Sequence, residues 1–121
     1  MVEVIATDEM VEWFTGLDAE DQEAVDLVVG LLKDQGPTLA GTYSSAIKGS
    51  RKLRELRIQS HGRPLRVFYA FDPRRDAVLL IGGDKTGDAR FYDRLIPRAE
   101  AIWSQYLTEQ AAGLHDDDGD T

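Results

Sequence analysis

The chain has 121 residues, of which 42% are hydrophobic, a length that suits one domain with a buried core and is too short for two ordinary domains. It contains no cysteine, which excludes a disulfide scaffold, a cysteine-ligated zinc module and a thiol enzyme. No apolar run approaches the roughly 20 residues of a membrane span, and the N-terminus lacks the features of a signal peptide. We therefore expect a soluble, cytoplasmic domain with no membrane partner.

The charge of the chain is unevenly distributed. The formal net charge is -8, which taken alone argues against a nucleic-acid partner. Residues 1–47, however, hold one basic residue against ten acidic ones, and residues 99–121 hold six acidic residues and no basic one. Residues 48–98 hold thirteen basic residues against six acidic ones. This basic middle third predicts either a functional cationic surface or a basic face that pairs with an acidic face inside the fold.

The first third of the chain predicts a short strand followed by two helices. Residues 2–6 are mostly β-branched, which favours a strand, and Thr7 or Asp8 is a suitable cap for a helix that ends at Gly16. Asp18 caps a second helix, which Gly36 and Pro37 end. Each helix has an apolar stripe at helical spacing: Met10, Trp13, Phe14 and Leu17 in the first, and Val25, Val28, Val29 and Leu32 in the second. We expect a helical hairpin with an acidic outer face.

The rest of the chain predicts a meander of strands and a final helix. Residues 38–50 have no sustained period and are predicted to be a loop, whereas residues 51–59, 65–72 and 77–82 favour three antiparallel strands. A short helical turn is expected through Phe91 and Tyr92, with Pro97 in the first turn of the last helix. Residues 113–121 form an acidic segment that we predict to be disordered. The order β-α-α-β-β-β-α over residues 1–112 defines a single α+β domain, an antiparallel sheet with a helical hairpin on one face and a C-terminal helix.

Three charged residues are predicted to meet on one face of this sheet. Side chains two residues apart on a strand share a face, so Glu55 and Arg57 point to the same side. On the next strand, Arg66 shares a face with Phe68 and Ala70, and the opposite face carries Leu65, Val67, Tyr69 and Phe71. If the helical hairpin covers the more apolar face, Glu55, Arg57 and Arg66 converge on the other face. Two interpretations remain open: a cross-strand ladder of ion pairs, or a functional site.

Lys85 and Tyr92 follow the last strand and lie close to this face in the prediction. Lys85 stands in the segment Gly82-Gly-Asp-Lys-Thr-Gly87, which lacks the spacing of a phosphate-binding P-loop. Tyr92 points either into the core or toward the charged residues. His61 is expected in a turn and His115 in the acidic tail, so we predict neither a metal site nor a cofactor.

Three blocks of this sequence together resemble the RelE/HigB-like toxins of type II toxin-antitoxin modules, in their phage-derived branch. They are residues 47–57 (Ile-Lys-Gly-Ser-Arg-Lys-Leu-Arg-Glu-Leu-Arg), residues 66–71 (Arg-Val-Phe-Tyr-Ala-Phe), and residues 80–87 (Leu-Ile-Gly-Gly-Asp-Lys-Thr-Gly) with Phe91, Tyr92, Ile96 and Pro97 after them. The resemblance extends over about residues 2–108 and agrees with the element order expected from the residues.

The resemblance implies a metal-independent mRNA endonuclease that works on the ribosome. In this chemistry the ribose 2′-OH attacks the adjacent phosphate and leaves a 2′,3′-cyclic phosphate. It implies Glu55 as the base, Arg57 and Arg66 as the phosphate clamp, Lys85 as a charge stabiliser, and Tyr92 as a positioning or protonating group. The surrounding cations are predicted to contact RNA: Lys48, Arg51, Lys52, Arg54 and Arg90.

The same resemblance leaves two other functions open. One is a non-enzymatic inhibitor of gyrase like the ParE group, and the other is a catalytically degenerate subunit that only binds its antitoxin and operator. All three imply a helix-turn-helix antitoxin encoded by an adjacent gene. We expect an acidic segment of it to bind the basic surface over or near Arg57, Arg66 and Lys85, or to displace the last helix that flanks them, rather than to bind the acidic helices.

Overall fold

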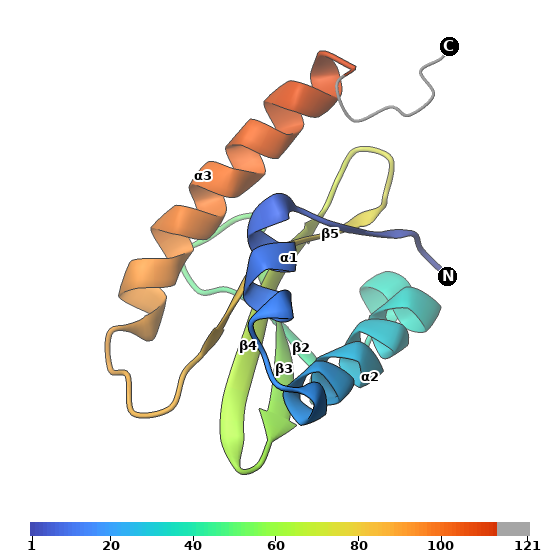
Figure 1. Ribbon diagram of the computed structural model, residues 1–121. Coiled ribbons are helices and arrows are strands. Elements are labelled where there is room, and N and C mark those ends of the chain that lie inside the picture. The colour runs from blue at the N-terminus through green and yellow to red at the C-terminus, as the bar shows by residue number, and fades with distance from the viewer. Residues whose placement is uncertain (114–121) are drawn as a thin grey trace.

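The computed structural model describes residues 1–113 and shows a five-stranded sheet with helices on both faces (Figure 1). The strands lie in the order β1-β5-β4-β3-β2. The elements along the chain are β1 (Val4–Ala6), α1 (Asp8–Thr15), α2 (Ala19–Gln35), a 3-10 turn (Gly36–Thr38), β2 (Ser44–Ala46), β3 (Arg54–Ser60), β4 (Arg63–Phe71), β5 (Ala77–Asp84) and α3 (Phe91–Ala111). The predicted disordered tail lies outside the described residues, apart from Gly113.

Side-chain caps define the starts of the two N-terminal helices, as the sequence predicts. The Met10 amide donates to Thr7 Oγ1 over 3.2 Å at the start of α1. The Asp21 amide donates to Asp18 Oδ1 over 2.8 Å at the start of α2. Gly36, with a φ of 55°, ends α2 in a conformation that favours glycine.

The predicted α+β class is confirmed, and the sheet adds two features to the prediction. The pairs β2–β3, β3–β4 and β4–β5 are antiparallel, but β1 pairs parallel with β5, so the sheet is mixed. Residues 38–50 are not all loop, because β2 pairs with β3 in the register Ser45 to Glu55. Ser-Ser-Ala has no apolar alternation, and its strand conformation comes from pairing with β3 rather than from local preference.

The two faces of the sheet carry separate cores. The side chains of Leu56, Leu65, Val67, Tyr69 and Leu79 pack under α1 and α2. Phe68, Ala70, Val78 and Leu80 pack under α3. Two glycines near the end of β5 permit close approach on either side, since a Cβ on Gly82 would lie 2.3 Å from the Trp13 ring and one on Gly83 would lie 2.7 Å from Phe91.

The last helix is longer than predicted. It begins at Phe91 rather than near Pro97, and Pro97 lies inside it. A proline at this position cannot donate to the carbonyl one turn earlier, which costs the helix one hydrogen bond. Burial of Phe91, Leu95 and Ala99 on the sheet outweighs that loss. At the other end, buried Asp72 accepts hydrogen bonds from Tyr106 and Gln110 and joins α3 to the β4–β5 turn.

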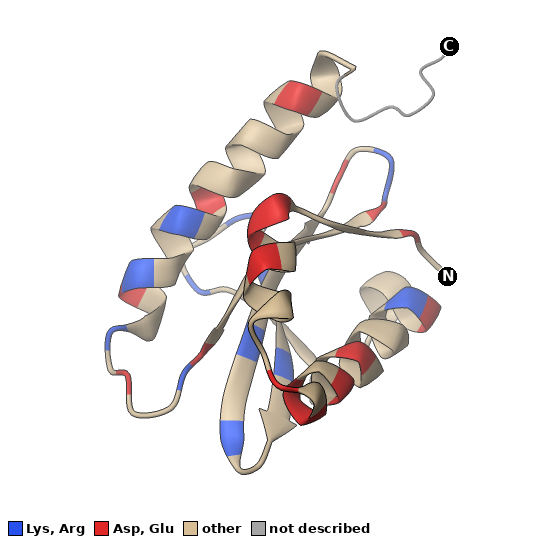
Figure 2. Cartoon of the chain, in the orientation of Figure 1, with Lys and Arg blue, Asp and Glu red and all other residues tan. Residues whose placement is uncertain are grey.

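The charges lie on different parts of this framework (Figure 2). Acidic residues concentrate on α1 and α2, whereas basic residues lie on β3 and β4, in the loops before β3 and α3, in the β4–β5 turn and on the first half of α3. Arg63 joins the two regions through an ion pair with the buried Asp21. Within residues 1–113, no helix is long and apolar enough to cross a membrane.

Candidate active site

Glu55 is a buried carboxylate near the middle of the sheet. It lies on β3, on the face that α3 covers in part, and its side chain is only 5% exposed. Tyr92 donates its hydroxyl to Glu55 Oε1 over 2.7 Å, and Ser45 donates to Oε2 over 3.2 Å. A buried carboxylate is costly unless hydrogen bonds and cations stabilise it, so these two donors hold it in one orientation.

Two guanidinium groups approach this carboxylate from opposite strands. Arg57 on β3 and Arg66 on β4 are direct cross-strand partners. Arg57 Nε lies 3.5 Å from Glu55 Oε2, and Arg66 Nε lies 3.6 Å from Oε1. Two cations placed opposite each other repel, and the carboxylate between them offsets that repulsion. The sequence alternation therefore predicts this convergence correctly.

Arg66 differs from Arg57 in its surroundings. The Arg66 side chain is 12% exposed, against 47% for Arg57. One terminal nitrogen of Arg66 donates to the Leu65 carbonyl over 3.1 Å, but its buried Nε has no hydrogen-bond partner among the described residues. Glu55 lies beyond hydrogen-bond distance from that atom. The site therefore retains an unused buried donor beside its carboxylate.

Tyr92 and Lys85 complete the cluster. The Tyr92 ring stacks on Phe68 at a centroid distance of 6.1 Å and an interplanar angle of 9°. Lys85 Nζ lies 5.2 Å from the centre of the same ring, within the range of a cation–π contact. Burial, and then the hydrogen bond to Glu55, raise the pKa of the Tyr92 phenol above its usual value of 10. The phenol is thus protonated at neutral pH, and Tyr92 points toward the charged residues.

The structure brings together all five residues implied as catalytic. The residues predicted to contact RNA lie outside this cluster. Lys48, Arg51 and Lys52 are exposed in the segment between β2 and β3, and Arg90 is exposed just before α3. Arg54 lies on the opposite face, because its cross-strand partner is Tyr69. Its guanidinium donates to Ser44 Oγ and Tyr69 Oη there. Arg54 is therefore not part of the cluster.

Sequence reasoning missed two members of the site. Ser45 stands in the stretch expected to be a loop, and only its pairing with Glu55 across β2–β3 brings its hydroxyl to the carboxylate. Phe68 was recognised as a neighbour of Arg66 on the same face, but its role as the surface under Tyr92 depends on where α3 begins. Two serines before a charged strand occur in many sequences, so this pattern does not predict a hydrogen bond from Ser45 to Glu55.

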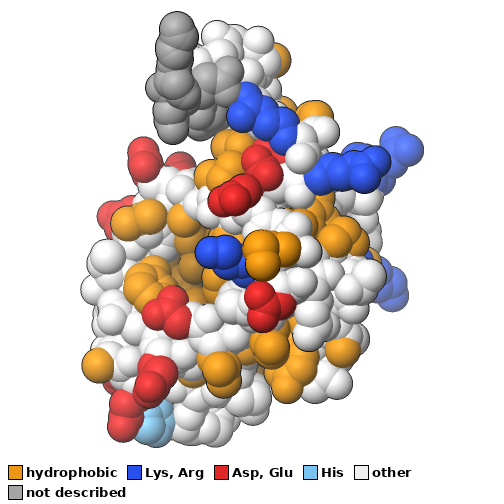
Figure 3. Space-filling view, turned by 90° about the vertical axis from the view of Figure 1, so that its right-hand side faces the viewer, with side chains coloured by type: hydrophobic (Ala, Val, Ile, Leu, Met, Phe, Trp, Pro, Cys, Tyr) orange, Lys and Arg blue, Asp and Glu red, His pale blue; other side chains and the backbone are white. Residues whose placement is uncertain are grey.

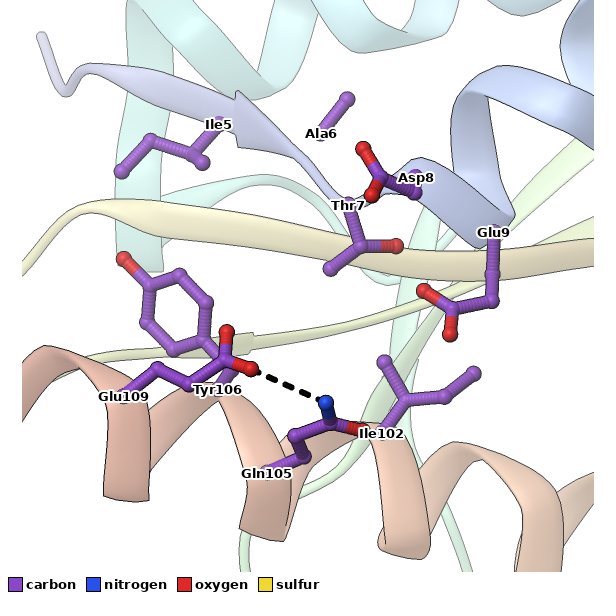
Figure 4. A pocket seen from close by; sticks show the side chains of 9 residues that line it. All are labelled: Ile5, Ala6, Thr7, Asp8, Glu9, Ile102, Gln105, Tyr106 and Glu109. Atoms are coloured by element: carbon purple, nitrogen blue, oxygen red, sulfur yellow. Dashed lines mark hydrogen bonds between the residues drawn. The ribbon is translucent and has the colours of Figure 1, made fainter. Parts of the chain in front are cut away.

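Two further features bear on what the site could bind. Within residues 1–113 no group of three or more His, Cys, Asp or Glu side chains is placed to hold a metal ion, and His61 is exposed beside Glu20. A cavity of about 200 Å³ lies between α3 and residues 5–9 (Figure 4). It is lined by the carboxylates of Asp8, Glu9 and Glu109, so its charge is wrong for a phosphate.

The arrangement of helices and sheet has a counterpart among solved structures. The chain matches the isolated RelE toxin of E. coli with a TM-score of 0.57 over 81% of this chain and 98% of that chain. Sequence identity is 9%, so this likeness concerns the fold alone. The chain therefore has a RelE-like fold.

Sequence relatives define the family more closely. Residues 12–104 match the family described as "Phage derived protein Gp49-like (DUF891)". Two relatives in Mycobacterium tuberculosis are "Putative toxin HigB3", 34% identical over 91% of this chain and 97% of that protein, and "Putative toxin HigB2", 36% identical over 80% of this chain. The chain spans about half the length of HigB2. The chain belongs to the Gp49-like family, and the predicted resemblance to HigB toxins is confirmed.

Proposed function

We propose that this toxin-family protein is a metal-independent endoribonuclease that cleaves mRNA by attack of the ribose 2′-OH on the adjacent phosphate. The observation that supports it most directly is a buried carboxylate flanked by two guanidiniums, one of which keeps a buried Nε without a hydrogen-bond partner. An ion-pair ladder built only for stability would be expected to use that donor, because an unsatisfied buried group costs about 1–3 kcal/mol. A phosphate oxygen in the cluster would satisfy it.

Each step of the proposed reaction has a group suited to it. Glu55 takes the proton of the 2′-OH, and the new bond forms between the 2′-oxygen and phosphorus. Arg57 and Arg66 hold the phosphate and stabilise the negative charge that develops on its oxygens, and Lys85 adds a third cation. The bond from phosphorus to the 5′-oxygen breaks, and the protonated Tyr92 phenol or the Lys85 ammonium supplies a proton to the leaving group. The products are a 2′,3′-cyclic phosphate and a free 5′-hydroxyl.

The basic residues also indicate which partners the protein would bind. Lys48, Arg51, Lys52 and Arg90 would guide mRNA, on the ribosome, toward Glu55. A helix-turn-helix antitoxin encoded by an adjacent gene would neutralise the protein, with an acidic segment over Arg57, Arg66 and Lys85. The cytoplasm would be the compartment of both.

Replacement of Arg66 by alanine tests the function. We expect Arg66→Ala to lower cleavage by about 10²–10³-fold, the usual cost of one donor to a developing oxyanion, and to abolish growth inhibition. Arg98→Ala is the matched control, because Arg98 is an exposed arginine on α3 outside the cluster. Both variants are checked for folding by circular dichroism. A folded Arg66→Ala protein with full activity would overturn the proposal.

Two further measurements separate the proposed reaction from its alternatives. Cleavage of a ribosome-free RNA should continue in excess EDTA and should leave a cyclic phosphate, since Glu55 and the three cations supply the base and the positive charge. Ribosome profiling after induction should show cut messages. Growth inhibition with intact messages and inhibited gyrase would indicate a ParE-like toxin instead, and antitoxin and operator binding without growth inhibition would indicate a regulatory subunit.

A further inference from the structure

An apolar groove lies between α1 and α2, on the face of the sheet opposite Glu55. It has a volume of about 240 Å³, and its floor includes the buried side chains of Met10, Val25 and Leu79. Its sides include Phe14, Val29 and Val11, and Val11 is 48% exposed. For comparison, a cavity of about 150 Å³ can hold a benzene molecule, so this groove has room for more than one apolar side chain.

The surface around the groove is strongly acidic. Asp26 lines the groove itself. Together α1 and α2 carry eight carboxylates and one basic residue, Lys33. Asp21 is buried and paired with Arg63, and the other seven are Asp8, Glu9, Glu12, Glu20, Glu23, Asp26 and Asp34. In the space-filling view, apolar side chains gather in a hollow on one face of the molecule, with carboxylates and a basic side chain beside it (Figure 3). An apolar centre and a mainly acidic rim favour an occupant that has both apolar and cationic side chains.

We propose that this groove is a docking site for a cationic amphipathic helix of a protein partner. Such a helix would place apolar side chains at spacings of three, four and seven residues into the groove, and Lys or Arg against Asp26 and the helix carboxylates. RNA does not fit, because its phosphates would face the same carboxylates. The segment 113–121 of this chain does not fit either, since it carries four aspartates and one leucine.

The location of the groove separates it from the proposed nuclease site. Met10, Val25 and Leu79 belong to the core under α1 and α2, whereas Glu55 lies with Phe68 on the face under α3. A helix in the groove therefore leaves Glu55, Arg57 and Arg66 accessible. The docking surface does not depend on whether the protein cleaves RNA.

Binding of a designed peptide tests the proposal. The probe is a fluorescent 15-residue helical peptide with leucine at positions 1, 4, 8 and 11 and alanine and lysine elsewhere, and its partner has glutamate in place of every lysine. We expect the lysine peptide to bind in 0.15 M salt and to shift NMR signals of Met10, Val11 and Val29. We expect the glutamate peptide to bind at least tenfold more weakly.

Two matched variants distinguish the groove from a general attraction to an acidic protein. Val11→Asp and Leu27→Asp each add one carboxylate in place of an exposed apolar side chain, but Leu27, 70% exposed on α2, does not line the groove. We expect Val11→Asp to weaken binding at least tenfold and Leu27→Asp to leave it within twofold. Asp26→Asn should reduce the salt dependence of binding. Circular dichroism checks that all three variants are folded.

Several outcomes would overturn the proposal. Equal binding by the Val11→Asp and Leu27→Asp proteins would show attraction to charge alone, and equal binding of the two peptides would show that charge does not select the occupant. A dimer by analytical ultracentrifugation that Val11→Asp dissociates would make a second copy of the chain the occupant. Failure of RNA cleavage would leave the peptide result intact, so the two proposals can fail independently.

Discussion

Removal of the Tyr92 hydroxyl tests whether its hydrogen bond to Glu55 contributes to cleavage. Tyr92→Phe removes the 2.7 Å hydrogen bond to Glu55 Oε1 but keeps a ring that can stack on Phe68. We expect cleavage to fall about 10²-fold or more, the usual contribution of a positioned proton donor. Tyr43→Phe, which changes an exposed tyrosine in the segment before β2, should leave the rate unchanged in the same assay.

The pH dependence of cleavage carries a second prediction about Tyr92. Its phenol pKa is raised above 10 by burial and by Glu55, so it remains protonated throughout the neutral and mildly alkaline range. Ionisation of Tyr92 should therefore cause no loss of activity below pH 10. The check is a pH–rate profile on ribosome-free RNA, compared with that of Tyr92→Phe. A drop near pH 8 or 9 that disappears in the phenylalanine variant would contradict the role of a protonated phenol.

At the same scale, the sequence shows which site residues were predictable. Strand alternation has a period of two and places Glu55, Arg57 and Arg66 on one face without any knowledge of the fold. Tyr92 could not be assigned a direction, because a residue at the start of a helix follows no face until the helix is placed on the sheet. Ser45 could not be found at all, since its contact to Glu55 depends on β2 pairing with β3.

At the scale of elements, the packing of α1 on β5 depends on a glycine. Gly82→Ala would place a Cβ 2.3 Å from the Trp13 ring, and a ring packed between a helix and a strand has little room to move. We expect a loss of about 1–3 kcal/mol of unfolding free energy, the usual cost of overpacking. Gly30→Ala is the matched control, because a Cβ there meets nothing within 4 Å on α2. It should stabilise the protein by up to about 1 kcal/mol, and urea unfolding measures both.

A second element-scale prediction concerns the network that joins α2 to the β3–β4 turn and to the end of β5. Arg63 donates to Asp21 and also, over 3.0 Å, to Asp84, and Ser60 donates to Asp21. Hydrogen bonds from Arg63 and then Ser60 lower the pKa of Asp21 below its usual value of about 3.8. A carboxyl with a lowered folded-state pKa stabilises the fold above its unfolded pKa, and that stability is lost as pH falls through the folded pKa.

Asp21→Asn tests this network. The variant should be less stable than the unsubstituted protein at pH 7. The difference should shrink as pH falls from about 4 through the lowered folded-state pKa, because the Asp21 carboxylate of the parent is protonated first in the unfolded state and only at still lower pH in the folded state. Thermal unfolding between pH 2 and pH 7 measures it. A stability difference that stays constant over this range would show that the charge of Asp21 does not contribute.

Some helices and strands were predictable from the sequence, and others were not. Caps and apolar stripes are local signals, and Thr7, Asp18 and Gly36 bound the helices where the sequence predicts. β2 was missed, and the helical turn at Phe91 and Tyr92 was predicted but not its continuity with the last helix, because both depend on partners distant in the chain. β2 exists through its ladder with β3, and the turn before Pro97 is helical because Phe91 and Leu95 are buried against the sheet.

The whole molecule combines a net charge of -8 with basic residues that lie mostly apart from the acidic helices α1 and α2, so the proposed RNA substrate would meet less repulsion on the basic side. Replacement of Lys48, Arg51, Lys52 and Arg90 by alanine removes four exposed cations of the loops and leaves Glu55, Arg57 and Arg66 in place. Each phosphate contact to a single strand contributes about 0.7 to the slope of log affinity against log salt, so this slope should decrease by up to about 3.

For the same variant we expect KM to rise and kcat to remain within a few-fold, because the proposed role of the removed cations is to guide the strand and not to contact the scissile phosphate. Lys33→Ala is the control, since it removes a cation from the acidic α2 and should change neither the slope nor KM. A fourfold variant whose kcat falls as strongly as that of Arg66→Ala would place these residues in the reaction itself. A variant with unchanged KM and slope would show that the Arg57 and Arg66 clamp binds RNA without help from the loops.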